Sequence, residues 1–173
     1  IQQAGANLLA KHNRLQYEVS AFGRLGHEAK HNLNYWQFGD YLGIGAGAHG
    51  KISAYKESKH SLSSLNLFRY RKTRMPKDYL AASYNLQPKP SFRIGEEAIV
   101  KDDLPFEFMM NVLRLRKGVP EKLFLERTDL ALEALEPVLS KLREQGLLEK
   151  SGLCPTDKGH LFLNNVLEHF AQA

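Results

Sequence analysis

The first residues that could do chemistry form a short run of histidine, asparagine and aromatic side chains, His31-Asn32-Leu33-Asn34-Tyr35-Trp36. A neutral imidazole can ligate iron, and aromatic rings can cover the face of a flat iron macrocycle. His31 is therefore a candidate axial ligand of haem iron, with Asn32, Tyr35 and Trp36 beside it. The same residue types also satisfy backbone groups and fill cores, so the run alone leaves both interpretations open.

A glycine-rich loop is the second candidate, because Gly45, Gly47 and Gly50 match the pattern G-x-G-x-x-G. A dinucleotide-binding loop of this kind needs a helix that opens at its last glycine and an acidic residue roughly 20 positions later. Residues 51–60 carry no apolar helical stripe, and the sequence near position 70 is basic. The pattern instead favours a tight turn, or backbone that approaches a ligand at the end of a barrel strand.

Metal and thiol chemistry have weaker signals. His27, His31 and His49 could form a nitrogen-only metal site, but their spacing fits no zinc pattern. Cys154 is the only cysteine of the chain, which excludes an internal disulfide and a metal site made of cysteines alone. Its apolar surroundings favour a small core residue over a nucleophile.

The charge of the chain is concentrated in its middle. The net charge of +5 divides into +1 for residues 1–50 (four basic, three acidic), +7 for 51–101 (eleven basic, four acidic) and −3 for 102–173 (nine basic, twelve acidic). Such a basic segment is either a solvated face or a contact for an anionic partner, such as haem propionates or an anionic lipid surface. Its densest part is Arg69, Arg71, Lys72, Arg74 and Lys77.

Few helices and strands are predicted over the first hundred residues, where most of these candidate residues lie. Residues 3–13 predict the end of a helix, and the alternation over 17–22 predicts one strand with Glu18 on its polar face. A second short strand is expected at 41–44. Residues 51–101 are expected to be irregular, because prolines interrupt them at Pro76, Pro88 and Pro90.

Residues 102–173 predict a winged-helix-like module. A helix that opens at Pro105 carries apolar residues at i, i+3, i+4 and i+7, namely Phe106, Met109, Met110 and Leu113. A short helix follows at 120–126, and a third ends at Gly146. A hairpin signal at 151–152 and a final helix capped by Thr156 complete the order. The module is net negative, whereas phosphate neutralisation needs clustered Lys and Arg, so no nucleic-acid partner is expected.

Three stretches resemble a known family: Tyr17-Glu18-Val19-Ser20-Ala21-Phe22-Gly23-Arg24, the His31–Trp36 run, and Gly39-Asp40-Tyr41-Leu42-Gly43-Ile44-Gly45-Ala46-Gly47-Ala48-His49-Gly50. They resemble the HemW-like haem chaperones, relatives of oxygen-independent coproporphyrinogen III oxidase (HemN) in the radical S-adenosylmethionine superfamily. The motif H-N-x-x-Y-W is typical of the chaperone branch. Later stretches agree, at 104–111, 126–128, 145–148 and 156–164, and the resemblance is weakest over 57–101.

The resemblance implies a fold and a domain order. Residues 1–56 would be the last strands of a partial (β/α) radical-SAM barrel, 57–101 a basic irregular linker, and 102–173 the winged-helix-like HemN C-terminal domain. The family's [4Fe–4S] cluster is held by a C-x-x-x-C-x-x-C loop, which this sequence lacks, so cluster ligands and most S-adenosylmethionine contacts would lie upstream. The chain is then expected to be a fragment that is inactive alone.

The resemblance also implies a function and site residues. The chain would belong to a cytoplasmic haem chaperone, peripheral at the membrane, that binds haem through His31 and delivers it to haemoproteins. Gly23 and His49 match positions near S-adenosylmethionine. The alternative function is that of a coproporphyrinogen III oxidase of porphyrin biosynthesis.

Overall fold

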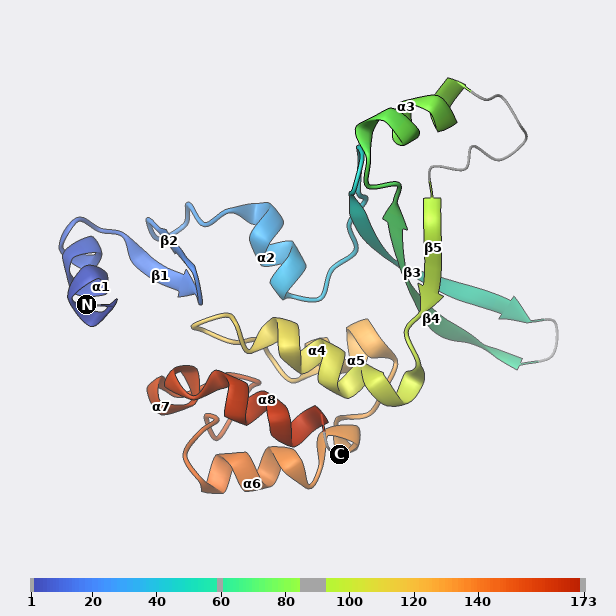
Figure 1. The fold of residues 1–173 in the computed structure, drawn as a ribbon. Coiled ribbons are helices and arrows are strands. Elements are labelled where there is room, and N and C mark those ends of the chain that lie inside the picture. The colour runs from blue at the N-terminus through green and yellow to red at the C-terminus, as the bar shows by residue number, and fades with distance from the viewer. Residues whose placement is uncertain (1, 59–60, 85–92, 172–173) are drawn as a thin grey trace. The chain divides into compact units, whose positions relative to one another are not determined.

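The computed structural model describes residues 2–58, 61–84 and 93–171, and the chain divides into two compact units (Figure 1). The helical unit combines Ile1–Phe38 with Asp102–Ala173, and the sheet unit is Gly39–Lys101. Among the described residues, no helix has the length and apolar character needed to cross a bilayer.

The helical unit begins with a helix, a hairpin and a second helix. They are α1 (Gln2–Lys11), β1 (Leu15–Glu18), β2 (Ala21–Gly23) and α2 (Lys30–Trp36). The single strand expected over 17–22 is wrong, because the chain turns after Glu18 and β2 pairs antiparallel with β1. Glu18 also forms an isolated bridge with Leu115, which places the segment after α4 (Leu104–Val112) beside β1.

The rest of the helical unit follows the predicted order of elements, except that the one final helix expected after Thr156 is divided into two. After the 3-10 turn η1 (Lys101–Asp103) come α4, α5 (Lys122–Thr128), the 3-10 turn η2 (Leu132–Leu135), α6 (Val138–Glu144), α7 (Asp157–Leu161) and α8 (Leu163–Ala171). The predicted wing is small. Leu148 bridges Pro155, and Glu149 N donates to Cys154 O at 2.9 Å. Thr156 caps the next helix as expected, since its Oγ1 accepts from Gly159 N at 3.0 Å.

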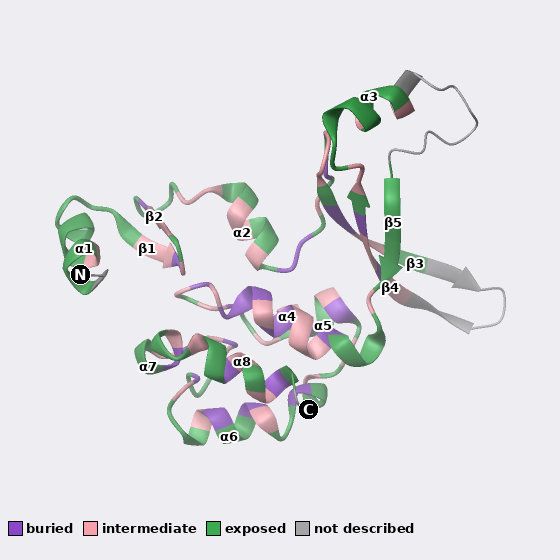
Figure 2. Cartoon of the chain, in the orientation of Figure 1, coloured by how far each residue is buried: buried purple, intermediate pink, exposed green. Residues whose placement is uncertain are grey.

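Three phenylalanine rings pack edge to face in the core of the helical unit. Phe108 packs edge-on against Phe38 and Phe124, with ring centroids 5.5 Å and 5.2 Å apart, and all three are buried (Figure 2). The predicted stripe of α4 is partly wrong, because Phe106 and Met110 are only half-buried. Since α4 packs on α2, α5 and α8, it buries more than one stripe, and Phe108 and Val112 join the core.

The sheet unit corrects the expectation of irregular structure over the described parts of residues 51–101; Pro88 and Pro90 lie outside the described residues. Three antiparallel strands stand in the order β3 (His49–Ser58), β4 (Ser61–Lys72) and β5 (Arg93–Ala98). Pro76 opens α3 (Pro76–Tyr84) instead of breaking a helix. The strand expected at 41–44 is reduced to one bridge between Tyr41 and Lys51.

The lowered pKa of His160, on α7, predicts that the protein loses stability in acid. Burial lowers its pKa below the ordinary 6.5, the nearby Arg116 charge lowers it further, and Asp157 opposes the shift. The folded state thus favours neutral imidazole, while the unfolded chain takes up a proton below 6.5. We expect the free energy of unfolding in urea to fall as the pH drops from 7.5 to 5.5. The fall should be smaller in His160→Gln, and an equal fall in both proteins would contradict this origin.

Candidate functional site

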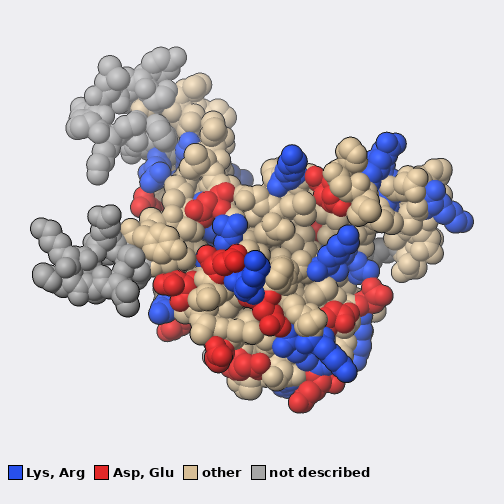
Figure 3. Space-filling view, turned by 180° about the vertical axis from the view of Figure 1, so that it is seen from behind, with Lys and Arg blue, Asp and Glu red and all other residues tan. Residues whose placement is uncertain are grey.

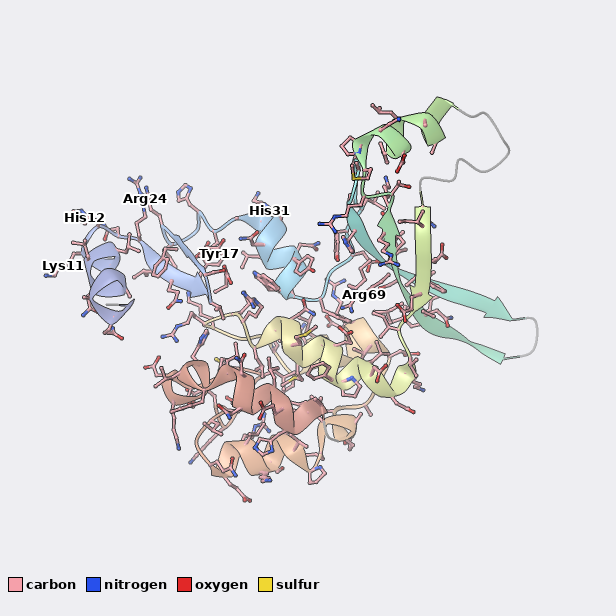
Figure 4. The ribbon with its side chains drawn as sticks, viewed as in Figure 1. Lys11, His12, Tyr17, Arg24, His31 and Arg69 are labelled. Carbon is pink, nitrogen blue, oxygen red and sulfur yellow. The ribbon has the colours of Figure 1, made fainter. Side chains whose placement is uncertain are left out.

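The outer face of α2 presents an imidazole and a phenol ring. His31 lies in the first turn of the helix and is exposed, and Figure 4 shows it at the start of α2, on the side away from α4. Tyr35 follows one turn later and is 40% exposed. Residues at i and i+4 share a helix face, so both side chains are available to one ligand approaching from solvent.

The inner face of α2 holds the helix in place. Asn32 Nδ2 donates to the Tyr17 hydroxyl at 3.0 Å, which ties α2 to β1. Trp36 lies under Arg114, whose guanidinium carbon is 4.3 Å from the ring centroid. Tyr35 meets Trp36 edge-on, at 4.8 Å between centroids. The structure thus brings the predicted haem residues together on one helix, but Asn32 and Trp36 face protein.

Two residues of this region were not indicated by the sequence. Strand alternation placed Glu18 on a polar face, yet it is 2% exposed. Its Oε2 lies 3.6 Å from Arg114 Nη2. A charged residue inside a short strand was the available signal for Glu18. Arg114 had none, since its partners come from segments roughly 80 and 100 positions away along the chain.

The two residues matched to S-adenosylmethionine positions lie in different units. Gly23, on β2, is buried, and an added Cβ would meet Tyr17 Cδ1 at 3.5 Å and His27 O at 3.6 Å. These are ordinary contacts, so alanine fits there. His49 begins β3 in the sheet unit and is exposed.

The glycine loop is built for packing. A Cβ on Gly50 would overlap the Tyr70 ring, and one on Gly43 would overlap the His49 carbonyl. The Tyr70 hydroxyl accepts from Gly43 N at 3.0 Å. A strand, not a helix, follows the last glycine, so the loop lacks the helix N-terminus of a dinucleotide site.

The metal and thiol alternatives gain no support. Within the described parts of the chain, no three His, Cys, Asp or Glu side chains come together as a metal site. Cys154 is half-buried; burial and the Glu149 charge raise the pKa of its thiol. A thiol with a raised pKa is a poor nucleophile at neutral pH.

Several basic side chains of the sheet unit lie against their neighbours. Arg69 stands opposite Glu97 in the β4–β5 register. Arg71 Nε donates to Ile94 O at 3.2 Å, and Arg93 stacks 4.5 Å from the Tyr70 ring centroid. On the face drawn in Figure 3, basic and acidic side chains are interspersed.

Comparison with known proteins identifies the family. The model of the HemN C-terminal domain matches residues 99–162. The heme chaperone HemW of Haemophilus influenzae is 37% identical over 172 residues, which cover 98% of this chain and 41% of that protein. HemW of Escherichia coli is 36% identical over 175 residues, with the same coverage. The chain belongs to the HemW and HemN-like family.

The fold agrees with that of the oxidase branch. The solved structure of coproporphyrinogen III oxidase (HemN) from Escherichia coli, described as a radical SAM enzyme, has a TM-score of 0.60 at 15% identity, over 98% of this chain and 40% of that one. A radical S-adenosyl methionine domain-containing protein of Dictyostelium discoideum is 26% identical. The chain spans about 41% of the HemW relatives that it matches.

Proposed function

We propose that this chain is the C-terminal portion of a haem chaperone that binds haem through His31 and passes it to haemoproteins. One observation carries the proposal: an exposed histidine and an exposed tyrosine share a face of α2, and the adjoining face of that helix is anchored. The resemblance to proteins named heme chaperone at 36–37% identity supports it.

An exposed ligand suits a carrier better than a resident haem site. His31 offers an imidazole nitrogen to the iron, and Tyr35 offers a ring to the porphyrin face. Because neither side chain lies in a closed pocket of the described protein, haem could leave toward an acceptor without unfolding of the carrier. Haem is then cargo, held by few protein contacts and released by exchange of the axial ligand.

The finer fold assignment is part of the proposal. Residues 1–56 would include the last strands of a partial (β/α) barrel, 57–101 a connecting basic segment, and 102–173 the winged-helix-like domain. Gly23 and His49 would contact S-adenosylmethionine. The chain's one cysteine cannot supply the three cysteine ligands that the family's cluster motif contains, so no step of the proposed function depends on the cluster.

The experiment titrates ferric haem into the full-length protein and follows the Soret band. A saturable shift at one haem per chain is expected. The same protein, with its cluster reconstituted, is assayed anaerobically with coproporphyrinogen III. Decarboxylated product without stoichiometric haem binding would replace the chaperone function by the oxidase function.

The proposed function also includes a location in the cell. We propose a cytoplasmic protein that meets membranes peripherally through the densest part of the basic segment, Arg69, Arg71, Lys72, Arg74 and Lys77. Sedimentation with anionic vesicles should show binding at low salt that is lost at high salt, since surface charges are screened. Binding that does not change with salt, or no binding at all, would contradict this contact.

A further inference from the structure

A largely buried ion pair joins β1 to the segment that follows α4, beside the inner face of α2. Arg114 Nη2 lies 3.6 Å from Glu18 Oε2; the Glu18 side chain is 2% exposed and the Arg114 side chain 30%. The same guanidinium covers the indole of Trp36 at 4.3 Å. One side chain therefore contacts a carboxylate of β1 and an aromatic ring of α2.

The backbone around Arg114 is held by the same strand. Val19 N donates to Arg114 O, and Arg116 N donates to Tyr17 O, each at 3.0 Å. Tyr17 in turn accepts from Asn32 of α2 at 3.0 Å. Asn32 and Trp36 anchor the two ends of α2. Both are thus held by β1 and the segment 114–116.

Glu18, Arg114 and Trp36 each have a buried polar atom that makes no hydrogen bond to any described residue. Over the part of the chain that the structure describes, Glu18 Oε2, Arg114 Nε and Trp36 Nε1 are buried without a hydrogen-bond partner. A largely buried ion pair with incomplete hydrogen bonding is weak evidence for stability. What the ion pair does contact is α2, through the Trp36 ring.

We propose that Arg114 is a positioning residue for haem binding, which holds Trp36 and so fixes the face that carries His31 and Tyr35. The inference rests on the proposed function. Successive residues of a helix are about 100° apart around its axis, so His31 and Tyr35 adjoin the anchored pair Asn32 and Trp36. A rotation of α2 that released Trp36 would also carry the imidazole out of its binding orientation.

The test uses three variants of the full-length protein. Arg114→Met removes the cation, and Glu18→Gln/Arg114→Met also removes the buried carboxylate that the first variant leaves unpaired. The matched control is Arg143→Met, which removes an arginine that pairs with Glu121 and donates to Gly152 O, neither of which belongs to α2 or β1. Haem affinity and Soret position are measured beside unfolding in urea.

We expect Arg114→Met to weaken haem binding about tenfold, which corresponds to roughly 1.4 kcal/mol, and to shift the Soret band. The double variant should recover stability but not haem affinity, because Trp36 still lacks its cation. Arg143→Met should lose stability and keep both haem readouts. Recovery of haem affinity together with stability in the double variant would overturn the inference, and so would an equal haem defect in Arg143→Met.

Failure of the inference can be distinguished from failure of the proposed function. If His31→Ala weakens haem binding while Glu18→Gln/Arg114→Met does not, the positioning role alone is wrong. If His31→Ala leaves haem binding unchanged, the haem site itself is wrong and the positioning role falls with it.

Discussion

Replacing His31 by alanine should lower the haem affinity of the full-length protein by roughly a hundredfold, a loss of about 2.7 kcal/mol. The imidazole is the ligand to iron that the outer face of α2 is proposed to offer, and Tyr35 is proposed to stack on the porphyrin face. Optical titration should show a lower affinity and a Soret band displaced toward that of haem without a histidine ligand.

The matched control for this substitution is His27→Ala. His27 is also exposed, and it precedes α2, so it shares the residue type and the exposure of His31 but not its helix. Haem affinity and spectrum should be unchanged in His27→Ala. Equal losses in His27→Ala and His31→Ala would show non-specific haem adsorption.

The second large effect is expected on stability, from Gly50→Ala. Tyr70 is 5% exposed, and its ring occupies the space that a Cβ at position 50 would need. Because the obstacle is a buried ring held by a hydrogen bond from Gly43 N, it cannot move freely. Overpacking of this kind costs about 1–3 kcal/mol. Amide hydrogen exchange of β3 and β4 should therefore become faster.

A double variant tests the cause of that loss. In a Tyr70→Leu background the new methyl group meets a smaller side chain, so Gly50→Ala should cost less there than in the wild type. Gly5→Ala is the control, since nothing lies within 4 Å of its added Cβ and alanine favours a helix by roughly 0.5–1 kcal/mol. Equal costs in the wild type and in Tyr70→Leu would mean that the ring is not the obstacle.

Local patterns predicted the C-terminal helices well. Pro105 lies in the first turn of α4, Gly146 follows α6 at a φ of 66°, and Thr156 accepts the hydrogen bond of a helix cap. Such signals depend on neighbouring residues only, so a sequence contains them in full. The family resemblance was confirmed by the relatives and by the HemN C-terminal domain match.

The sequence prediction was wrong where a structure depends on pairing between segments that are distant in the chain. β3 and β4 lie in a part of the chain where prolines further along suggested irregular structure. Charged residues such as Arg69 and Arg71 stand on β4, which pairs with both β3 and β5. That pairing cannot be read from neighbouring residues in the sequence. Glu18 is buried because the segment 114–116 covers β1 from a distant part of the chain. For the same reason the motif located His31 and Trp36 but could not show that one faces solvent and the other a guanidinium.

The most direct test of the haem site is the iron–histidine stretching band of the haem complex after reduction to the ferrous state. Resonance Raman spectra would be compared between protein with natural histidine and protein with nitrogen-15-labelled histidine. The chain contains seven histidines, and His31 alone is proposed to bind the iron. The label should shift the iron–histidine band in the wild type and in His27→Ala, and the band should be absent in His31→Ala. A label-sensitive band that persists in His31→Ala would contradict the assignment of this helix face as the haem site.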